Sequence, residues 1–243
     1  MTIEIRIVKR VKLKNPTLIE GLPGLGLVGT IAASYLVEKL NMDLLGYIRS
    51  PSFPPLVAIH DFTPMYPVRL YYSKKHNLIV LLSEFIIPMN LVVEFSEAVL
   101  KFCEEVNISR IISLGSITIR GEQDTVYSIT TDQKIAKRLL DLGVELIKEG
   151  ATTGVTAILL AESVYRKIPT TSLLAEAHAE YADPRGASMV LRVTKDILGI
   201  EMNLKELEKE ARIIEKKMKE LISKSSKVQE KYKKLEDTLS MYG

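Results

Sequence analysis

TLIEGLPGLGLVGT, residues 17–30, predicts a strand over residues 17–20 that turns through a glycine-rich loop into a helix over residues 25–40. A short β-rich run followed at once by a helical period is the unit from which α/β sheets are built. The segment contains the G-x-G-x-x-G spacing of dinucleotide-binding turns. It therefore raises two questions, namely which fold surrounds it and whether it binds a nucleotide.

Two features count against a nucleotide at this turn. Asp43 is the acid at about the right distance, but it precedes the next predicted strand instead of ending it. Pro23 stiffens the turn where a diphosphate would lie. We interpret the four glycines of the turn as a sign of close packing between strand and helix, with nucleotide binding as the alternative.

The rest of residues 1–202 alternates β-rich runs with helical periods, which predicts a layered α/β fold around a largely buried sheet. Prolines between residues 50 and 67 confine that region to loops and edge strands. We expect strands at residues 3–11, 44–49, 56–60, 68–72, 78–82, 110–114 and 125–129. We expect the other helices at residues 91–106, 133–142, 154–166 and 184–198.

Composition narrows the class of protein. The single cysteine, Cys103, excludes an intrachain disulfide and a multi-cysteine metal site, and it predicts a buried thiol in a protein of the reducing cytosol. The longest uncharged stretch, residues 21–37, is interrupted by glycine and proline and is too short to cross a bilayer. We expect a cytoplasmic protein with no membrane span, metal or cofactor.

Residues 203–240 predict a helical extension of coiled-coil type. Asn203 and Glu206 have the spacing of a capping box, and the apolar residues that follow recur at heptad spacing. A helix of this length measures roughly 50 Å and needs a partner helix, unless it folds back on the core. Residues 203–243 carry 11 Lys and Arg against 8 Asp and Glu, an interleaved pattern that does not suit nucleic acid. The seam consists of Leu204, Leu207, Ala211, Ile214, Met218, Leu221, Val228, Tyr232, Leu235 and Leu239.

The last three residues predict a docking tripeptide. Met241 offers an adaptable apolar contact, Tyr242 a rigid amphipathic ring, and Gly243 an ionised carboxylate. Such a tip suits a pocket with a cation at its base.

Motifs of catalysis are missing from the sequence. It holds no H-E-x-x-H, C-x-x-C or G-x-S-x-G pattern, so we expect no enzyme. Polar residues beside predicted strand ends could still converge in a crevice, as sites in open α/β sheets do. They are Glu84, Arg120, Glu122, His178, Asp183 and Arg185, and Asp183-Pro184 also fits the capped start of a helix.

Four motifs occur in order and together resemble the archaeal branch of the proteasome assembly chaperone 2 family. They are GLPGLGLVG from Gly21, GATTGVTAILL from Gly150, IPTTSLLAE from Ile168 and ADPRGA from Ala182. The resemblance covers nearly all of residues 1–202 and implies a phosphorylase/hydrolase-like α/β sandwich without catalytic activity. It also implies a 20S proteasome as partner.

For the C-terminus, the resemblance implies the hydrophobic-tyrosine-X motif that enters pockets between adjacent proteasome α-subunits. Met241, Tyr242 and Gly243 match it, with Tyr242 at the pocket mouth and the Gly243 carboxylate on a pocket lysine. Gate opening without a nucleotide is a further implication. One tripeptide binds weakly, so we expect a homo-oligomer that presents several, with a tetramer as the first choice. The alternative is a small-molecule or nucleotide-binding enzyme that uses the crevice of the sheet.

Overall fold

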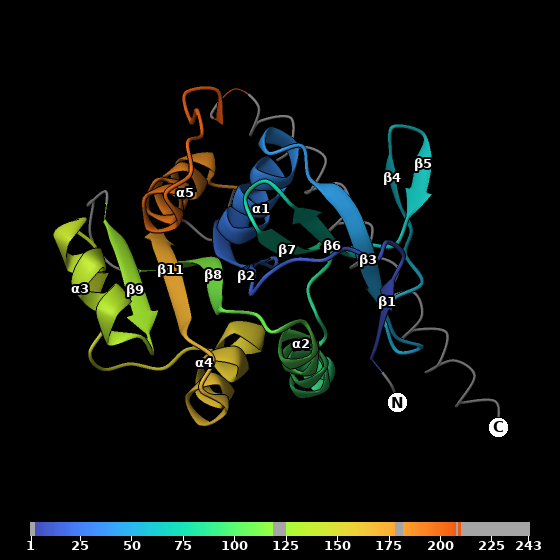
Figure 1. Cartoon of the computed structure of the whole chain (residues 1–243), viewed down its shortest axis with the longest axis horizontal. Helices are drawn as coiled ribbons and strands as arrows, with labels where there is room; N and C mark the ends of the chain where they lie inside the picture. Colours follow the sequence, from blue (N-terminus) through green and yellow to red (C-terminus); the bar gives the residue numbers. More distant parts are fainter. Residues whose placement is uncertain (1–2, 119–124, 178–181, 208, 210–243) are drawn as a thin grey trace, which may run out of the picture.

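The computed structural model describes residues 3–118, 125–177, 182–207 and 209, which form a mixed sheet with helices on both faces (Figure 1). The strands are β1 (Glu4–Ile7), β2 (Thr17–Gly21), β3 (Asp43–Arg49), β4 (Ala58–His60), β5 (Thr63–Met65), β6 (Val68–Ser73), β7 (Leu78–Ser83), β8 (Arg110–Ile117), β9 (Val126–Thr130), β10 (Glu145–Leu146) and β11 (Thr170–Glu176). The main sheet has the order β1-β3-β6-β7-β2-β8-β11-β9-β10. Strands β7, β2, β8 and β11 are parallel at its centre.

Two helical layers cover this sheet. The helices are α1 (Val28–Lys39), α2 (Val92–Val106), α3 (Gln133–Asp141), α4 (Gly154–Arg166) and α5 (Pro184–Leu198). One face carries α1, α3 and α5, and the other carries α2 and α4 (Figure 1). Strand β2 is buried at all of its residues because its neighbours Leu18 and Ile19 point into opposite cores. The predicted α/β layering is thus confirmed.

The glycines of the first turn allow α1 to lie directly against the sheet. A Cβ atom on Gly29 would lie 2.1 Å from the carbonyl oxygen of Leu114 in β8. A Cβ atom on Gly21 would lie 2.3 Å from the Cβ atom of Ala33. Both distances are too short for any side chain, so the packing interpretation is confirmed for Gly21 and Gly29. It is wrong for Gly24, where a Cβ atom would meet nothing within 4 Å, and Gly26 instead adopts a positive φ of 61°.

The ends of α4 and α5 agree with the sequence prediction at both termini. At the start of α5, the Asp183 carboxylate accepts a hydrogen bond of 2.8 Å from the Gly186 N–H, and Pro184 takes the first helical position. Gly199 ends the helix in the left-handed conformation at φ 65°. The predicted Asp183 cap is therefore confirmed.

The sequence prediction missed three strands. β11 is the most important, because it is an interior strand of the sheet and lies between β8 and β9. Its first half, Thr170-Thr171-Ser172, is polar and therefore does not resemble a buried strand, yet all three residues are buried. The hydroxyls of Thr170 and Thr171 form hydrogen bonds there, such as that from Thr170 Oγ1 to Ser163 Oγ at 2.6 Å. β5 and β10 are short edge elements. The strand expected over residues 3–11 is only the four residues of β1.

The proline-rich region forms a hairpin of its own. β4 and β5 pair with each other in a separate two-stranded sheet that projects beside the edge of the main one (Figure 1). Asp61 and Phe62 both have positive φ, at 46° and 64°, as a tight two-residue hairpin turn requires. The Phe62 side chain at the tip is 100% exposed.

Two expectations from composition can be compared with the described residues. Cys103 lies on α2 and is buried, as predicted. Among the helices that the structure describes, none combines the length and the apolar character needed to span a membrane.

The start of the predicted extension packs on the body. Leu207 is fully buried in the core beside α1, and the Tyr35 hydroxyl donates a 2.6 Å hydrogen bond to the Asn203 carbonyl. The Asn203 side chain accepts from the Lys205 N–H at 3.0 Å, as a cap does. Glu206 forms a 3.1 Å ion pair with Lys39. The remaining heptad positions, from Ala211 onward, lie outside the described residues.

Candidate functional site

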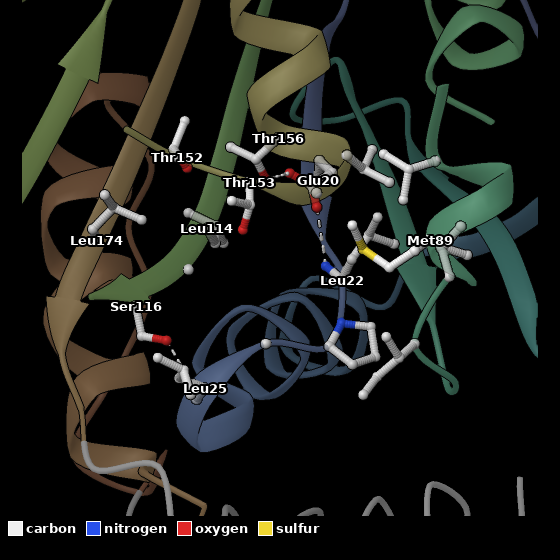
Figure 2. A pocket seen from close by; sticks show the side chains of 18 residues that line it. Glu20, Leu22, Leu25, Met89, Leu114, Ser116, Thr152, Thr153, Thr156 and Leu174 are labelled. Carbon is white, nitrogen blue, oxygen red and sulfur yellow. Dashed lines mark hydrogen bonds between the residues drawn. The ribbon is translucent and has the colours of Figure 1, made fainter. Parts of the chain in front are cut away.

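A cavity of about 310 Å³ opens at the carboxyl ends of the parallel strands β2, β8 and β11 (Figure 2). Ligands of open α/β sheets bind at this edge, because the loops that leave parallel strands meet there. The residues after β2, the end of β8 and the first turn of α4 supply most of the lining. The loop that follows β7 closes the remaining side with Ile86, Ile87 and Met89.

Glu20 lies at the floor of this cavity and is 1% exposed. Its Oε1 atom accepts a 3.2 Å hydrogen bond from the Leu22 N–H. Its Oε2 atom accepts from Ser113 Oγ and, at 3.0 Å, from Thr156 Oγ1 (Figure 2). Burial raises the pKa of Glu20 above its usual value, and these three hydrogen bonds lower it in part.

A count of the hydrogen atoms in this cluster also favours a protonated Glu20. Glu20 Oε2, Ser113 Oγ and Thr156 Oγ1 form three mutual contacts, of which the hydroxyl–hydroxyl contact measures 2.9 Å. Two hydroxyls supply only two hydrogens for three contacts. A proton on Oε2 that is donated to one hydroxyl allows that hydroxyl to donate to the other, which supplies the third hydrogen and agrees with the direction in which burial moves the pKa of Glu20.

Around Glu20 the cavity is lined by aliphatic side chains and by the hydroxyl groups of Ser116, Thr152 and Thr153, with no other titratable group. Glu20 alone is titratable among the 18 lining residues, and none of them is Lys, Arg or His. Figure 2 shows Leu22 beside Glu20 and Leu174 on the opposite side of the cavity from Met89, which is 77% exposed. The arrangement can hold a compact ligand with one polar end and an apolar body.

Of the polar residues that the sequence nominated, the three that the structure describes do not line this cavity. Asp183 caps α5, and Glu84 lies at the end of β7 in a different cluster. Arg185 does not line the cavity. The other nominated residues and the docking tripeptide lie outside the residues that the structure describes, namely Arg120, Glu122, His178, Met241, Tyr242 and Gly243.

Glu84 belongs to a buried ion cluster that ties the β4–β5 hairpin to the sheet. Arg69 Nη2 donates to Glu84 Oε1 at 2.6 Å, and both side chains are almost fully buried. His60 Nε2, on the hairpin, lies 2.6 Å from the same oxygen. Arg69 Nη1 also donates to the Tyr66 carbonyl at 2.9 Å. The cluster therefore joins two strands of the main sheet to the hairpin, which is a structural role.

Sequence reasoning missed Glu20, Ser113 and Thr156. Glu20 ends the predicted strand before the glycine turn, so its position in the sequence was a usable signal. Ser113 lies in the middle of β8 and is paired in register with Glu20 on β2. Thr156 comes from α4, far away in sequence, and only the strand order brings it to the other two.

The structure gives no support to a dinucleotide at the glycine turn. Asp43 is the first residue of β3, and two strands, β6 and β7, separate β3 from β2. Its carboxylate pairs with Lys9 at 3.1 Å instead of facing the turn.

Within the described ranges, no group of three or more His, Cys, Asp or Glu side chains has the geometry to hold a metal ion.

The sequence of this chain is similar to a known protein family and to proteins of other organisms. The model of the PAC2 family matches residues 18–222, which extends beyond the predicted body into the predicted extension. An uncharacterized protein of Methanocaldococcus jannaschii is 31% identical over 205 residues, which cover 84% of each chain.

Two solved structures from Pyrococcus furiosus are similar in both sequence and fold. PbaA, described as an archaeal homolog of proteasome-assembly chaperone, has 32% identity and a TM-score of 0.81, over 94% of this chain and 100% of PbaA. PbaB, described as an archaeal proteasome activator, has 26% identity and a TM-score of 0.75, over 90% of this chain and 98% of PbaB. With a family model that spans most of its length and the ordered motifs of its sequence, this chain belongs to the PAC2 family.

Proposed function

We propose that this chain is a noncatalytic proteasome-binding protein of the assembly-chaperone and activator type. The observation that carries the proposal is its similarity to both PbaA and PbaB, at 32% and 26% identity over at least 90% of this chain. One of these relatives is described as a chaperone homolog and the other as a proteasome activator. Both descriptions name the proteasome.

The proposed contact is the tripeptide Met241-Tyr242-Gly243 in a pocket between two α-subunits of the 20S ring. Tyr242 enters the pocket mouth, Met241 packs beside it, and the Gly243 carboxylate pairs with a lysine of the pocket. A buried aromatic ring and a charge-assisted hydrogen bond together give such a short peptide its specificity. Insertion of several such tips opens the gate of the ring without a nucleotide.

Several tips must act together because one is weak. A tripeptide contributes no more than about −5 kcal/mol, which corresponds to a dissociation constant on the order of 0.2 mM. Linking several tips on one homo-oligomer raises the apparent affinity by roughly 10² to 10⁴. We propose a tetramer, joined through the heptad seam or through exposed apolar surface of the body. Val57, Ile59 and Phe62 on and beside the β4–β5 hairpin supply such surface.

Substitution of Tyr242 tests the docking contact. Tyr242→Ala removes the ring, and one residue added after Gly243 moves the carboxylate; each change is expected to weaken binding to purified 20S proteasome at least tenfold. Tyr165→Ala is the matched control, because Tyr165 is an exposed tyrosine on α4, 83% exposed, far from the tail in sequence. Binding is measured by surface plasmon resonance and gate opening by hydrolysis of a fluorogenic peptide. Unchanged binding of both tail variants, with the oligomer intact by light scattering, contradicts the docking mechanism.

The cavity beside Glu20 favours a second candidate, an enzyme or binding protein for small molecules. A thermal-shift screen with nucleotides and nucleosides separates it from the first, because a ligand of the folded state raises the melting temperature in a saturable way. Saturable stabilisation by one of them, together with proteasome binding that does not depend on the tail, would favour the second candidate.

A further inference from the structure

The carboxyl group of Glu20 has no opposite charge inside its cavity. None of the lining residues is Lys, Arg or His, and Glu20 makes no ion pair among the described residues. Buried acids are normally paired with a cation or bound to a metal, because an isolated charge is costly in a medium of low dielectric constant. A proton on Glu20 removes this charge, and the three mutual contacts among Oε2, Ser113 Oγ and Thr156 Oγ1, two of them made by Oε2, are consistent with it.

The two carboxyl oxygens differ in what they have left to offer. Oε2 is saturated by the hydroxyl groups of Ser113 and Thr156. Oε1 accepts one hydrogen bond, from the Leu22 N–H at 3.2 Å, and an oxygen of a carboxylate can accept two. An N–H group that enters the cavity therefore finds one free acceptor at its floor.

We propose that this cavity binds a small organic amine, with its ammonium group on Glu20 Oε1 and its apolar part between Leu22, Ile87 and Leu174. This site is separate from the proposed tail contact, and it requires neither the tripeptide nor the proteasome. A cavity of about 310 Å³ accommodates a ligand of roughly ten non-hydrogen atoms. An anionic ligand is disfavoured because the lining offers it no Lys, Arg or His as a counter-ion.

Proton balance follows from this arrangement. The amine enters as R–NH₃⁺, Glu20 releases its proton to solvent, and the resulting carboxylate pairs with the ammonium group. The pocket is uncharged before binding and uncharged after it. Binding therefore releases a proton to buffer, and the heat of binding measured by calorimetry depends on the ionisation enthalpy of that buffer. Glu20 is the only titratable side chain that faces the cavity among its lining residues, so the released proton has one source.

Four probes with the same ring and different head groups test the proposal on the isolated protein. They are benzylamine, benzamide, benzyl alcohol and benzoate. We expect benzylamine to bind with a dissociation constant on the order of 1 mM, which is reasonable for a ligand of eight non-hydrogen atoms. Benzamide and benzyl alcohol should bind at least tenfold more weakly, and benzoate should not saturate. Methyl-¹³C methionine spectra follow the titration, since Met89 stands at the rim and a Met89→Leu spectrum assigns its signal.

Two variants link the binding to the cavity. Glu20→Gln keeps the shape of the side chain but cannot become an anion, and it should raise the dissociation constant of benzylamine by about tenfold or more. Thr153→Trp places a large ring at the cavity wall from an exposed position whose side chain makes no capping hydrogen bond, and it should block binding without touching Glu20. Circular dichroism and the melting temperature establish that each variant is folded.

Three results overturn the proposal. One is the failure of benzylamine to saturate the Met89 signal of the folded protein. Another is equal affinity for benzylamine and benzyl alcohol, which would mean that the cavity recognises only the ring. The third is unchanged affinity in folded Glu20→Gln. Should Glu20→Gln fail to fold, Thr153→Trp and the dependence of the binding heat on the buffer still decide the question.

Discussion

Replacing Gly29 by alanine tests whether the glycine turn exists for packing. The new Cβ atom would lie 2.1 Å from the Leu114 carbonyl oxygen and 3.1 Å from that of Leu22, so α1 must move away from β8 by about 1 Å. Overpacking of this kind costs about 3 kcal/mol when the obstacle is rigid backbone. Alanine in place of glycine within a helix returns about 1 kcal/mol. The net loss is therefore about 2 kcal/mol of the free energy of unfolding, or roughly 4–8 °C in melting temperature for a domain of this size.

Gly24 supplies a matched control from the same turn. A Cβ atom at Gly24 meets nothing within 4 Å, and its φ of −146° is extended backbone that alanine adopts freely. Gly24→Ala should change the free energy of unfolding by less than about 0.5 kcal/mol. Urea unfolding followed by circular dichroism measures both variants. If Gly29→Ala costs no more than Gly24→Ala, the close approach of α1 to β8 is not what requires glycine at position 29.

Three further predictions concern buried groups. Burial raises the folded-state pKa of Glu20 above the usual 4.5, so the unfolded chain loses this proton at a lower pH than the folded chain does. The free energy of unfolding of the wild type should therefore fall relative to that of Glu20→Gln as the pH rises from 4 to 7. Urea unfolding at several pH values measures the difference in free energy between the two proteins, and a difference that does not change with pH contradicts the raised pKa. Arg69→Ala leaves Glu84 buried without its cation and should lower the free energy of unfolding by about 3–5 kcal/mol in urea. Arg166→Ala is the control, because the acidic partners of Arg166 are exposed, and it should lower the free energy of unfolding by less than about 1 kcal/mol. Equal losses would contradict a stabilising role for the buried Arg69–Glu84 pair. Burial raises the pKa of Cys103 to about 12, so its reaction with a disulfide reagent at pH 8 should follow the unfolding of the chain, and a rapid reaction of the folded protein would show that the thiol is accessible.

Local signals were enough to predict most of the elements. The ends of α5 follow from Asp183, Pro184 and Gly199, which act within one turn of the helix that they bound. The packing role of Gly29 also follows from its place between a strand and a helix. These features are predictable because the residues that cause them are neighbours in the chain.

The remainder depends on strand order, which no local pattern contains. β11 begins with Thr170, Thr171 and Ser172, and such a polar start is not recognisable as an interior strand from its own sequence. The fold places Thr170 Oγ1 where it donates to Ser163 Oγ, and it places Thr171 Oγ1 within 2.8 Å of Thr130 Oγ1. The Glu20 cluster was missed for the same reason. Its acid comes from β2, and its two hydroxyls come from β8 and α4, which the topology brings together. The polar residues that the sequence analysis selected beside predicted strand ends were too many, and too widely spaced along the chain, to indicate a single site.

Removal of Met241-Tyr242-Gly243 tests the proposed function most directly. The full chain and the shortened chain are compared at equal oligomeric state in a titration against purified 20S proteasome, with hydrolysis of a fluorogenic peptide measured alongside. Docking of several tails predicts that the full chain binds at least 100-fold more tightly and that only the full chain accelerates hydrolysis. Equal binding of the two chains would mean that the body, and not the tail, makes the contact with the proteasome.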